Sequence, residues 1–450
     1  MTADPGAPPP PVAQHLAIVL PTTGEFDSRT WRIASSAVSR GHTVTVIARA
    51  APGLPAEERH VAGYRILRVA ADPWSALPAG TRLQSWRRRR EPAASSAPGM
   101  APPVSSGPAP GSVSRGILAR ARTVLRGATR LGAIWLSIRA QTASARRADP
   151  GADLYHGMAY MGIPVAASLG AQRGAPVVYD ARDIYVDAGN LARLPGPARW
   201  LVGWQERRRA RAASRVVTVN RPYAEVMASR WDVDLPLIVL NCSYRYEPAR
   251  APDRRFQRLL GLSDGTFVVL YQGGLSPERG IEQLIEAMRE VPDAALVLMG
   301  YGSIRERLQG LATDPDLGGR VRFAPAVPPD ELLDWIAASD VVAMPIQPST
   351  LNHRLTTPNK LFEAMAAGVP VVASDLPGMA PIVRETGAGV LVDPTDPSAI
   401  AAAIRRLLGD PRERTAMADR ALAAAHESYN WERQAAILFQ EYGRLTGRPW

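Results

Sequence analysis

Lys360 and Glu363 are the charged side chains whose setting first indicates chemistry. The chain has 53 Lys and Arg residues, and all of them except Lys360 are arginine. Both side chains lie in TTPNKLFEAMAAGVPVVAS (356–374), where the two threonines suit a helix cap and the following proline suits the first turn. A helix N-terminus favours anions, a compact ammonium suits a phosphate, and a carboxylate accepts hydrogen bonds from sugar hydroxyls. Chance placement of a single lysine in an arginine-rich chain is the alternative.

Two glycine turns follow predicted strands in the same half of the chain. GGLSPERG (273–280) brings Arg279 within reach of a phosphate, and GYG (300–302) allows close backbone approach. Each turn alone also fits a tight connection without a ligand. The chain has no G-x-x-x-x-G-K-[ST] loop and no G-x-G-x-x-G opening its first helix, which disfavours dinucleotide oxidoreduction.

Polar residues at strand ends of the first half form a second candidate group. His156 ends DLYH, and Asp180 and Asp183 follow PVVYD with Arg182 between them. A structural histidine, a helix cap and a surface ion pair are the alternatives for these residues. No Asp-x-Asp pair stands at a suitable strand end, so we expect neither a metal nor another cofactor.

Composition limits the class of protein. At 450 residues the chain is too long for one ordinary core, so two large domains are expected. The single cysteine, Cys242, excludes an internal disulfide framework. No apolar run is long enough for a membrane span, and MTADPGAPPPPVAQ lacks the features of a signal peptide. These features predict a cytoplasmic protein.

Most of the net charge of +11 falls in residues 82–147, which carry 13 arginines and one acidic residue, Glu91. This segment holds WRRRR (86–90), a Pro/Ser/Ala/Gly-rich stretch and a basic amphipathic helix that contains Trp135. Docking on an anionic membrane face and packing as a core helix with solvated arginines are both open. RNA binding is the weaker option because aromatic residues do not alternate with the basic ones, and a general nucleic-acid surface is not expected.

Apolar runs alternate with helical patterns, which predicts α/β domains with parallel sheets. The expected strands are 15–21, 42–49, 64–70, 153–156, 176–180, 215–220 and 236–241 in the first half, and 267–274, 295–302, 321–327, 340–346 and 369–374 in the second.

The segments YQGGLSPERGIEQLIEAM, LMGYG, APAVPPDELLDWIAASDVVAMPI and TTPNKLFEAMAAGVPVVAS, in this order, resemble the retaining glycosyltransferases of family 4, the glycosyl transferases group 1, in a form close to polysaccharide-assembly members. RGHTVTVIA, DLYHG, VVYDARDIY and VVTVN give a looser match in the first half. The resemblance implies the GT-B architecture, two Rossmann-like domains facing across a cleft.

The resemblance also implies residue roles. Glu363 matches the glutamate that holds the ribose hydroxyls of a sugar nucleotide, and Arg279 matches one of two basic residues on the diphosphate. The second basic position falls on Gly274, and the first glutamate of the family's pair falls on Leu355. These are departures from the pattern, and Lys360 is expected to share the diphosphate contact.

The predicted catalytic residues are His156, Lys360 and Arg279, and the predicted acceptor-side residues are His156, Asp180 and Asp183. The predicted donor-binding residues are Gly24, Gly273, Gly274, Arg279, Gly300, Gly302, Val327, Asn352, Thr357, Lys360, Leu361 and Glu363.

The expected reaction moves a sugar from a nucleoside-diphosphate sugar to an acceptor hydroxyl, with retention and without metal. The expected partners are the donor, a glycan or polyprenyl-linked acceptor and an anionic membrane surface, which places the protein peripherally on the inner face of the plasma membrane. A sugar-nucleotide 2-epimerase and a non-catalytic membrane-bound scaffold are the alternatives. The predicted division is a disordered lead (1–13), an acceptor-side domain (14–245) with an insertion (86–147), a nucleotide-sugar-binding domain (246–428) and a returning helix (429–450).

Overall fold

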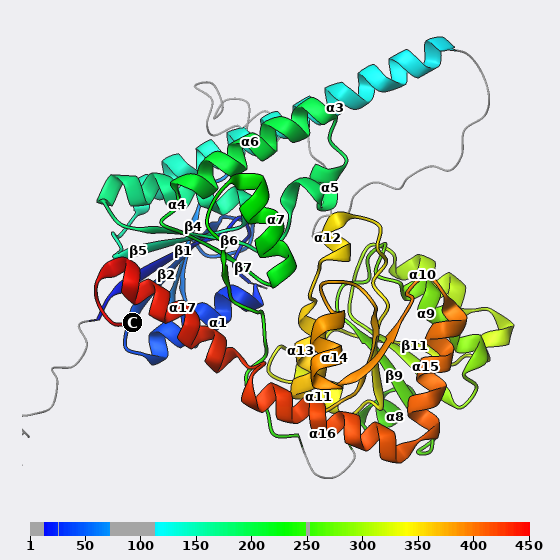
Figure 1. The fold of residues 1–450 in the computed structure, drawn as a ribbon. Coiled ribbons are helices and arrows are strands. Elements are labelled where there is room, and N and C mark those ends of the chain that lie inside the picture. Colours follow the sequence, from blue (N-terminus) through cyan, green and yellow to red (C-terminus); the bar gives the residue numbers. More distant parts are fainter. Residues whose placement is uncertain (1–12, 26, 73–112, 249–252) are drawn as a thin grey trace, which may run out of the picture.

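The computed structural model describes residues 13–25, 27–72, 113–248 and 253–450, which form two α/β halves side by side (Figure 1). Each half is built around its own sheet, and helix α17 (Trp431–Thr446), which follows the second half in sequence, lies on the first half. The parallel sheets confirm the predicted α/β class. WRRRR and the rest of residues 86–112 of the predicted insertion lie outside the described residues, as do the side chains of the arginines before Leu131 in helix α3 (Val113–Ala148).

The first sheet has the order β3-β4-β2-β1-β5-β6-β7-β8, parallel except for β3. Its strands are β1 (His15–Val19), β2 (Thr43–Arg49), β3 (Glu57–Arg59), β4 (Arg65–Val69), β5 (Leu154–Met158), β6 (Val177–Ala181), β7 (Arg215–Thr218) and β8 (Leu237–Ile238). Its helices are α1 (Ser28–Ser39), α3 (Val113–Ala148), α4 (Ala159–Arg173), α5 (Gly189–Ala192), α6 (Gly196–Ala212) and α7 (Arg221–Trp231).

The second sheet is wholly parallel, with the order β11-β10-β9-β12-β13-β14. Its strands are β9 (Phe267–Gln272), β10 (Ala294–Met299), β11 (Val321–Ala324), β12 (Val341–Met344), β13 (Val371–Ser374) and β14 (Gly389–Val392). Its helices are α8 (Arg255–Leu260), α9 (Ile281–Ala287), α10 (Arg305–Ala312), α11 (Leu332–Ala337), α12 (Leu351–Arg354), α13 (Asn359–Ala366), α14 (Ala380–Thr386), α15 (Pro397–Gly409) and α16 (Pro411–Glu427).

Buried apolar strands explain why these sequences form central sheets. β10 is buried along its whole length, as are β5, β6, β12 and β13, and helices on both faces of a parallel sheet produce this pattern. Two strands were not predicted. β3 is a short antiparallel strand at the edge of its sheet. β14 comes after a helix, and its residues do not alternate between apolar and polar side chains.

Helix α17 (Trp431–Thr446) ties the end of the chain to the first half. Its buried side chains, Trp431, Leu438, Phe439 and Tyr442 among them, belong to the same apolar cluster as β1 and β2. The Trp431 indole N–H donates to Ser36 Oγ of α1 at 2.9 Å. The last segment therefore packs on the first sheet, although the second half precedes it directly in sequence.

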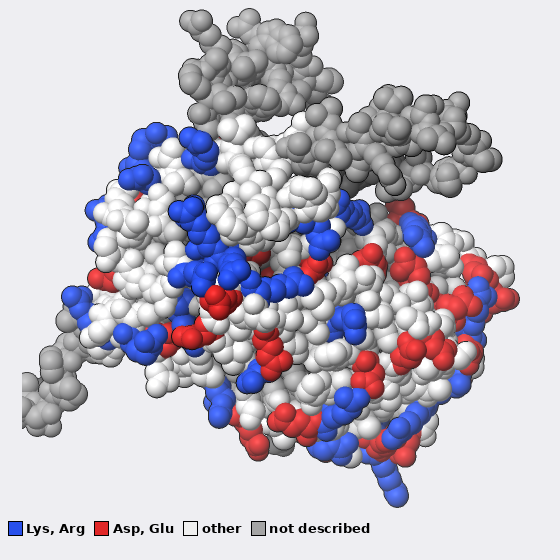
Figure 2. Space-filling model, turned by 45° about the horizontal axis from the view of Figure 1, so that its top comes forward, with Lys and Arg blue, Asp and Glu red and all other residues white. Residues whose placement is uncertain are grey.

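The two halves also differ in surface charge. In Figure 2 basic side chains gather over the left part of the molecule, which is the first half, whereas acidic and basic side chains mix over the right part. Within the described residues, no helix is both long and apolar enough to cross a bilayer.

Candidate functional site

The turn after β9 is built by backbone packing that only glycine permits. Gly300, at φ +146°, lies so close to this turn that a Cβ there would be 2.1 Å from the Gly273 carbonyl oxygen. A Cβ at Gly302 would be 2.0 Å from the Leu275 carbonyl oxygen. Gly300 and Gly302 therefore hold the turn that carries Arg279, whereas a Cβ at Gly274 would meet no atom within 4 Å.

Lys360 reaches the same turn from helix α13. Its Nζ lies 3.6 Å from the centre of the Tyr271 ring, a cation–π contact, and 3.9 Å from the position that a Cβ would take at Gly273. Burial, reinforced by the charge of Arg279, lowers the pKa of Lys360 to about 7, and Glu363 opposes this shift only in part. Lys360 makes no ion pair with any described carboxylate. The ammonium thus lies in a setting that disfavours its charge.

Arg279 is the second cation at this turn. Its Nε donates to Ser276 Oγ at 3.4 Å, and no carboxylate of the described residues pairs with it. Its charge contributes to the lowered pKa values of Lys360 and His353. Two cations that pair with no described carboxylate make a site suited to an anion. The N-terminus of α13 lies beside these cations and has no side-chain cap, because its N-cap residue is Pro358.

Glu363 lies one helical turn after Lys360. Burial raises the pKa of its carboxyl, and the Arg32 guanidinium, Lys360 and the Gln272 amide oppose that rise. Arg32 belongs to α1 of the first half, is 6% exposed and donates from Nη1 to Asn241 Oδ1 at 2.9 Å. Gln272 and Arg32 were not predicted. Gln272 has no motif of its own, and Arg32 is one arginine among many.

The segment around α12 joins the two halves. The Asn352 amide oxygen accepts from the Ile184 N–H at 2.8 Å, its Nδ2 donates to Asp183 Oδ1 at 3.0 Å, and its carbonyl accepts from the Tyr223 hydroxyl at 2.8 Å. Asp183, Ile184 and Tyr223 follow β6 and β7 of the first sheet. Asn352 and Asp183 therefore lie together where the two halves meet.

Thr357 lies in the same contact and was wrongly predicted as a helix cap. Its hydroxyl donates to the Gly378 carbonyl at 2.5 Å and accepts from Asn220 Nδ2 at 3.0 Å. Asn220, the N-cap of α7, also donates to the Leu355 carbonyl at 2.7 Å. The N-cap of α13 is Pro358, since the threonine hydroxyl has other partners.

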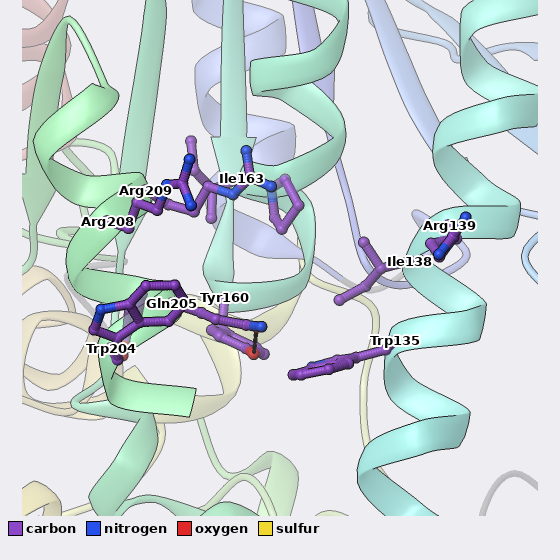
Figure 3. Close-up of a pocket in the computed structure, with 11 residues that line it drawn as sticks. Trp135, Ile138, Arg139, Tyr160, Ile163, Trp204, Gln205, Arg208 and Arg209 are labelled. Carbon is purple, nitrogen blue, oxygen red and sulfur yellow. Dashed lines mark hydrogen bonds between the residues drawn. The ribbon is translucent and has the colours of Figure 1, made fainter. Parts of the chain in front are cut away.

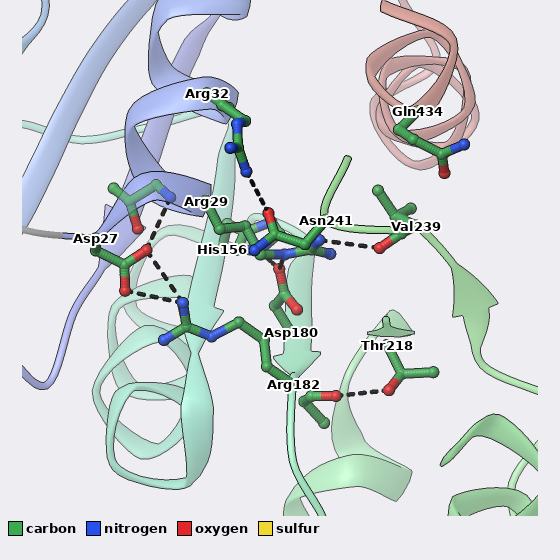
Figure 4. Close-up of polar contacts among 12 residues, drawn as sticks. Asp27, Arg29, Arg32, His156, Asp180, Arg182, Thr218, Val239, Asn241 and Gln434 are labelled. Atoms are coloured by element: carbon green, nitrogen blue, oxygen red, sulfur yellow. Dashed lines mark hydrogen bonds and ion pairs between the residues drawn. The ribbon is translucent and has the colours of Figure 1, made fainter. Parts of the chain in front are cut away.

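His156 and Asp180, predicted on the acceptor side, lie inside the first half and are fully buried (Figure 4). The imidazole Nε2 donates to Asp180 Oδ2 at 3.1 Å, and Nδ1 accepts from the Tyr442 hydroxyl at 2.6 Å. Arg29 Nε donates to the same Asp180 oxygen at 2.6 Å. Burial would raise the pKa of Asp180, but Arg29 and His156 outweigh burial and hold it well below its usual range.

These contacts place His156 and Asp180 in a different setting from Lys360. Both ring nitrogens are bonded, and one of their partners comes from α17 of the chain's last segment. The network therefore joins α1, β5, β6 and α17, and as it stands it offers no imidazole nitrogen to a substrate.

The remaining predicted positions lie in backbone or core settings. Gly24 follows β1 with φ +88°. Leu361 is fully buried in the apolar cluster of the second half, and Val327 packs against that cluster. No group of three His, Cys, Asp or Glu side chains in the described part of the chain is arranged to hold a metal ion.

Solved structures with the same architecture define the class of the fold. The chain aligns with sucrose-phosphate synthase from Thermosynechococcus elongatus at a TM-score of 0.70 and 22% identity, covering 96% of this chain and 99% of that one. Anabaena HepE in complex with UDP-glucose aligns at 0.62 and 17% identity, covering 96% and 100%. WaaG, a glycosyltransferase involved in lipopolysaccharide biosynthesis, aligns at 0.61 and 17%, with the same coverage. The fold is GT-B.

The second half of the chain is similar to a known family. Residues 253–423 match the model of glycosyl transferases group 1. A GDP-mannose-dependent alpha-(1-6)-phosphatidylinositol monomannoside mannosyltransferase of Mycolicibacterium smegmatis is 34% identical over 45% of this chain and 54% of its own length. A D-inositol 3-phosphate glycosyltransferase of Xylanimonas cellulosilytica is 30% identical over 57% and 62%. The chain thus spans little more than half the length of these relatives.

Proposed function

We propose that the protein is a glycosyltransferase that moves a sugar from a nucleoside-diphosphate sugar to an acceptor hydroxyl, with retention and without a metal ion. One observation carries the proposal. Arg279 and Lys360, two cations without a carboxylate partner in the described chain, meet at the turn after β9. A diphosphate supplies the negative charge that this pair lacks.

The residues present suit the bond that has to break. Cleavage at the anomeric carbon leaves negative charge on the departing diphosphate, and fixed positive groups aimed at that charge lower the barrier. Arg279, Lys360 and the N-terminus of α13 supply such groups. Glu363 would accept hydrogen bonds from the ribose hydroxyls, and the charge of Arg32 favours its ionised form.

A lipid-linked acceptor at a membrane surface is part of the proposal. Two observations support it: the arginine excess of residues 82–147, and the name of the 34% identical relative, which specifies a phosphatidylinositol mannoside. Peripheral binding to the inner face of the plasma membrane would bring the site to such an acceptor.

The epimerase alternative requires acid and base groups free to act on the sugar. Of the three acceptor-side groups predicted for the first half, His156 and Asp180 are bonded to each other and buried. The third, Asp183, accepts a hydrogen bond from Asn352. No observation therefore favours that alternative over transfer.

A thermal-shift panel of UDP-, GDP-, ADP- and dTDP-sugars tests the proposal. We expect one of them to raise the melting temperature, and we expect Lys360→Ala and Glu363→Ala to reduce that shift. The stabilising donor is then incubated with lipid and glycan acceptors in EDTA, and the anomeric configuration of the product is read by NMR.

The outcomes separate the alternatives. If no sugar nucleotide raises the melting temperature, the result favours the non-catalytic scaffold. If the donor is converted to its 2-epimer without an acceptor, the result favours the epimerase. Loss of transfer in EDTA or an inverted product would overturn metal independence or retention.

A further inference from the structure

A groove on the first half lies between helices α3, α4 and α6, apart from the Lys360 site (Figure 3). Its volume is about 360 Å³, within the usual range for small-ligand sites, roughly 300–1,000 Å³. Trp135 and Ile138 of α3 face Tyr160 and Ile163 of α4 across it, and α6 supplies Trp204 and neighbouring residues.

The groove has an aromatic and apolar wall. Burial raises the pKa of the Tyr160 hydroxyl to about 12, and this hydroxyl donates to Gln205 Oε1 at 3.3 Å. Below it Leu131 and Val202 pack with Tyr160 into a small apolar cluster. Trp204 keeps 46% of its surface exposed at the rim. Such an amphipathic lining suits a hydrocarbon chain that enters from water.

Three arginines lie at one end of the groove (Figure 3). Arg139, Arg208 and Arg209 line it, and none pairs with a described carboxylate. Their neighbours on α6 differ, because Arg207 and Arg211 both bind Asp232, at 3.3 and 2.6 Å. The unpaired arginines are thus the ones that face the groove.

The one acidic residue in the lining does little to offset these charges. Glu206 is 1% exposed, and its carboxyl accepts from the Tyr179 hydroxyl at 2.7 Å. Burial raises the pKa of Glu206 to about 7, so this carboxyl is substantially protonated near neutral pH. The lining as a whole is aromatic and positively charged.

The groove is connected to the contact between the two halves. Tyr160 is the second residue of α4, directly after β5, and Tyr185 and Val186 pack against the same apolar cluster. Tyr185 follows shortly after Asp183, which binds Asn352 of the second half. The three arginines lie at the far end of the groove from this contact, because they come late on α3 and α6, helices that lead back to the amino ends of β5 and β7.

We propose that this groove binds a single-chain lipid phosphate, with Trp135, Tyr160 and Trp204 on its hydrocarbon chain and Arg139 and Arg209 on its phosphate. The inference goes beyond the proposed transferase function, because a phosphate on these arginines lies away from the contact between the halves. It concerns a single amphiphile in a defined groove and does not depend on the basic segment that precedes Leu131.

Calorimetric titration with decyl phosphate, kept below the concentration at which it forms micelles, tests the groove. We expect saturable binding of one decyl phosphate per chain, with inorganic phosphate and decyl maltoside binding at least tenfold more weakly. Trp204→Ser and Arg209→Glu should each weaken the binding of decyl phosphate at least tenfold. Trp200→Ser is the matched control, because Trp200 is 69% exposed on the same helix but does not line the groove.

Three results would overturn the inference. The first is equal binding of decyl phosphate and inorganic phosphate, which would indicate charge alone. The second is an equal loss in Trp200→Ser and Trp204→Ser, which would indicate unspecific adsorption to α6. The third is a change in oligomeric state in Trp204→Ser without any change in decyl phosphate binding, which would indicate a contact between copies of the chain.

Donor-induced thermal shifts on the same variants separate this inference from the proposed function. A donor shift that persists while decyl phosphate fails to bind refutes the groove only. Binding of decyl phosphate by a protein that no sugar nucleotide stabilises refutes the transferase and leaves the groove as a binding site for a lipid phosphate.

Discussion

Donor binding should be linked to protonation of Lys360. In the free protein the pKa of this lysine is lowered to about 7, with burial as the main cause and Arg279 as the second. At about pH 8 only about one tenth of the ammonium would remain charged. A diphosphate placed beside Nζ restores the charge, so binding must take up a proton from solution.

The size of this linkage follows from the geometry. A unit negative charge about 4 Å from Nζ, at an effective dielectric constant near 20, contributes about 4 kcal/mol. Because one pKa unit corresponds to about 1.4 kcal/mol, the pKa of Lys360 in the complex returns to about 10. Between about pH 8 and pH 9 the donor affinity should therefore fall by about eightfold, with a shallower fall near pH 7.

The stability of the free protein should change in the opposite direction. The folded-state pKa lies below the unfolded value of 10.5, so the unfolded chain binds more protons between about pH 7 and 10.5. The contribution of Lys360 to stability without ligand therefore rises with pH across this window, while the stabilisation by the donor declines.

Calorimetry in buffers of different ionisation enthalpy measures the proton uptake directly. We expect close to one proton per donor at about pH 8 for the native chain and none for Lys360→Met. Lys360→Arg is the matched control, because arginine keeps its charge throughout and should give pH-independent affinity. Proton uptake near zero in the native chain, or the same pH slope in Lys360→Met, would refute a lysine of lowered pKa at the diphosphate.

Four further predictions test separate parts of the protein. Glu363→Gln should weaken donor binding by about 10- to 100-fold in calorimetry, as expected for lost charge-assisted hydrogen bonds, and an unchanged affinity would remove Glu363 from the donor site. Gly300→Ala, whose Cβ would lie 2.1 Å from a backbone oxygen, should lower the melting temperature by several degrees, whereas Gly274→Ala should not. Asn352→Ala should increase the radius of gyration in X-ray scattering, because it removes two bonds between the halves, and an unchanged radius would contradict this. Tyr442→Phe should lower stability by about 1 kcal/mol in urea and leave donor affinity unchanged, and a tenfold loss of affinity would show that the buried network is not merely structural.

Much of the fold could be predicted because its strands are buried on both faces. Continuous apolar runs such as AALVLM and VVAM identify β10 and β12 without regard to their neighbours. β3 and β14 lack this signal. EER is a charged edge strand, and GVLV is defined by pairing with β13 more than by its own composition.

The parts of the site that could not be predicted depend on contacts distant in sequence. His156 and Asp180 stand at strand ends, where an exposed polar residue is expected, but Tyr442 approaches from 286 positions later and closes the network. Arg32 reaches the surroundings of Glu363 only because the two halves meet. Lys360 could be chosen as a candidate from the sequence because it is the single lysine of an arginine-rich chain.

Two independent costs to stability coincide at the turn after β9. Glu278 has φ +68°, a left-handed conformation that costs a residue with a side chain about 1–2 kcal/mol. One residue later, Arg279 approaches Lys360 and contributes to the lowering of that lysine's pKa. Other cations of the second half are paired with carboxylates, for example Arg289 with Asp314 and Asp316. A strained backbone and a pair of mutually repelling cations are expected together only where a ligand offsets both, and a diphosphate held by the turn and α13 would do so.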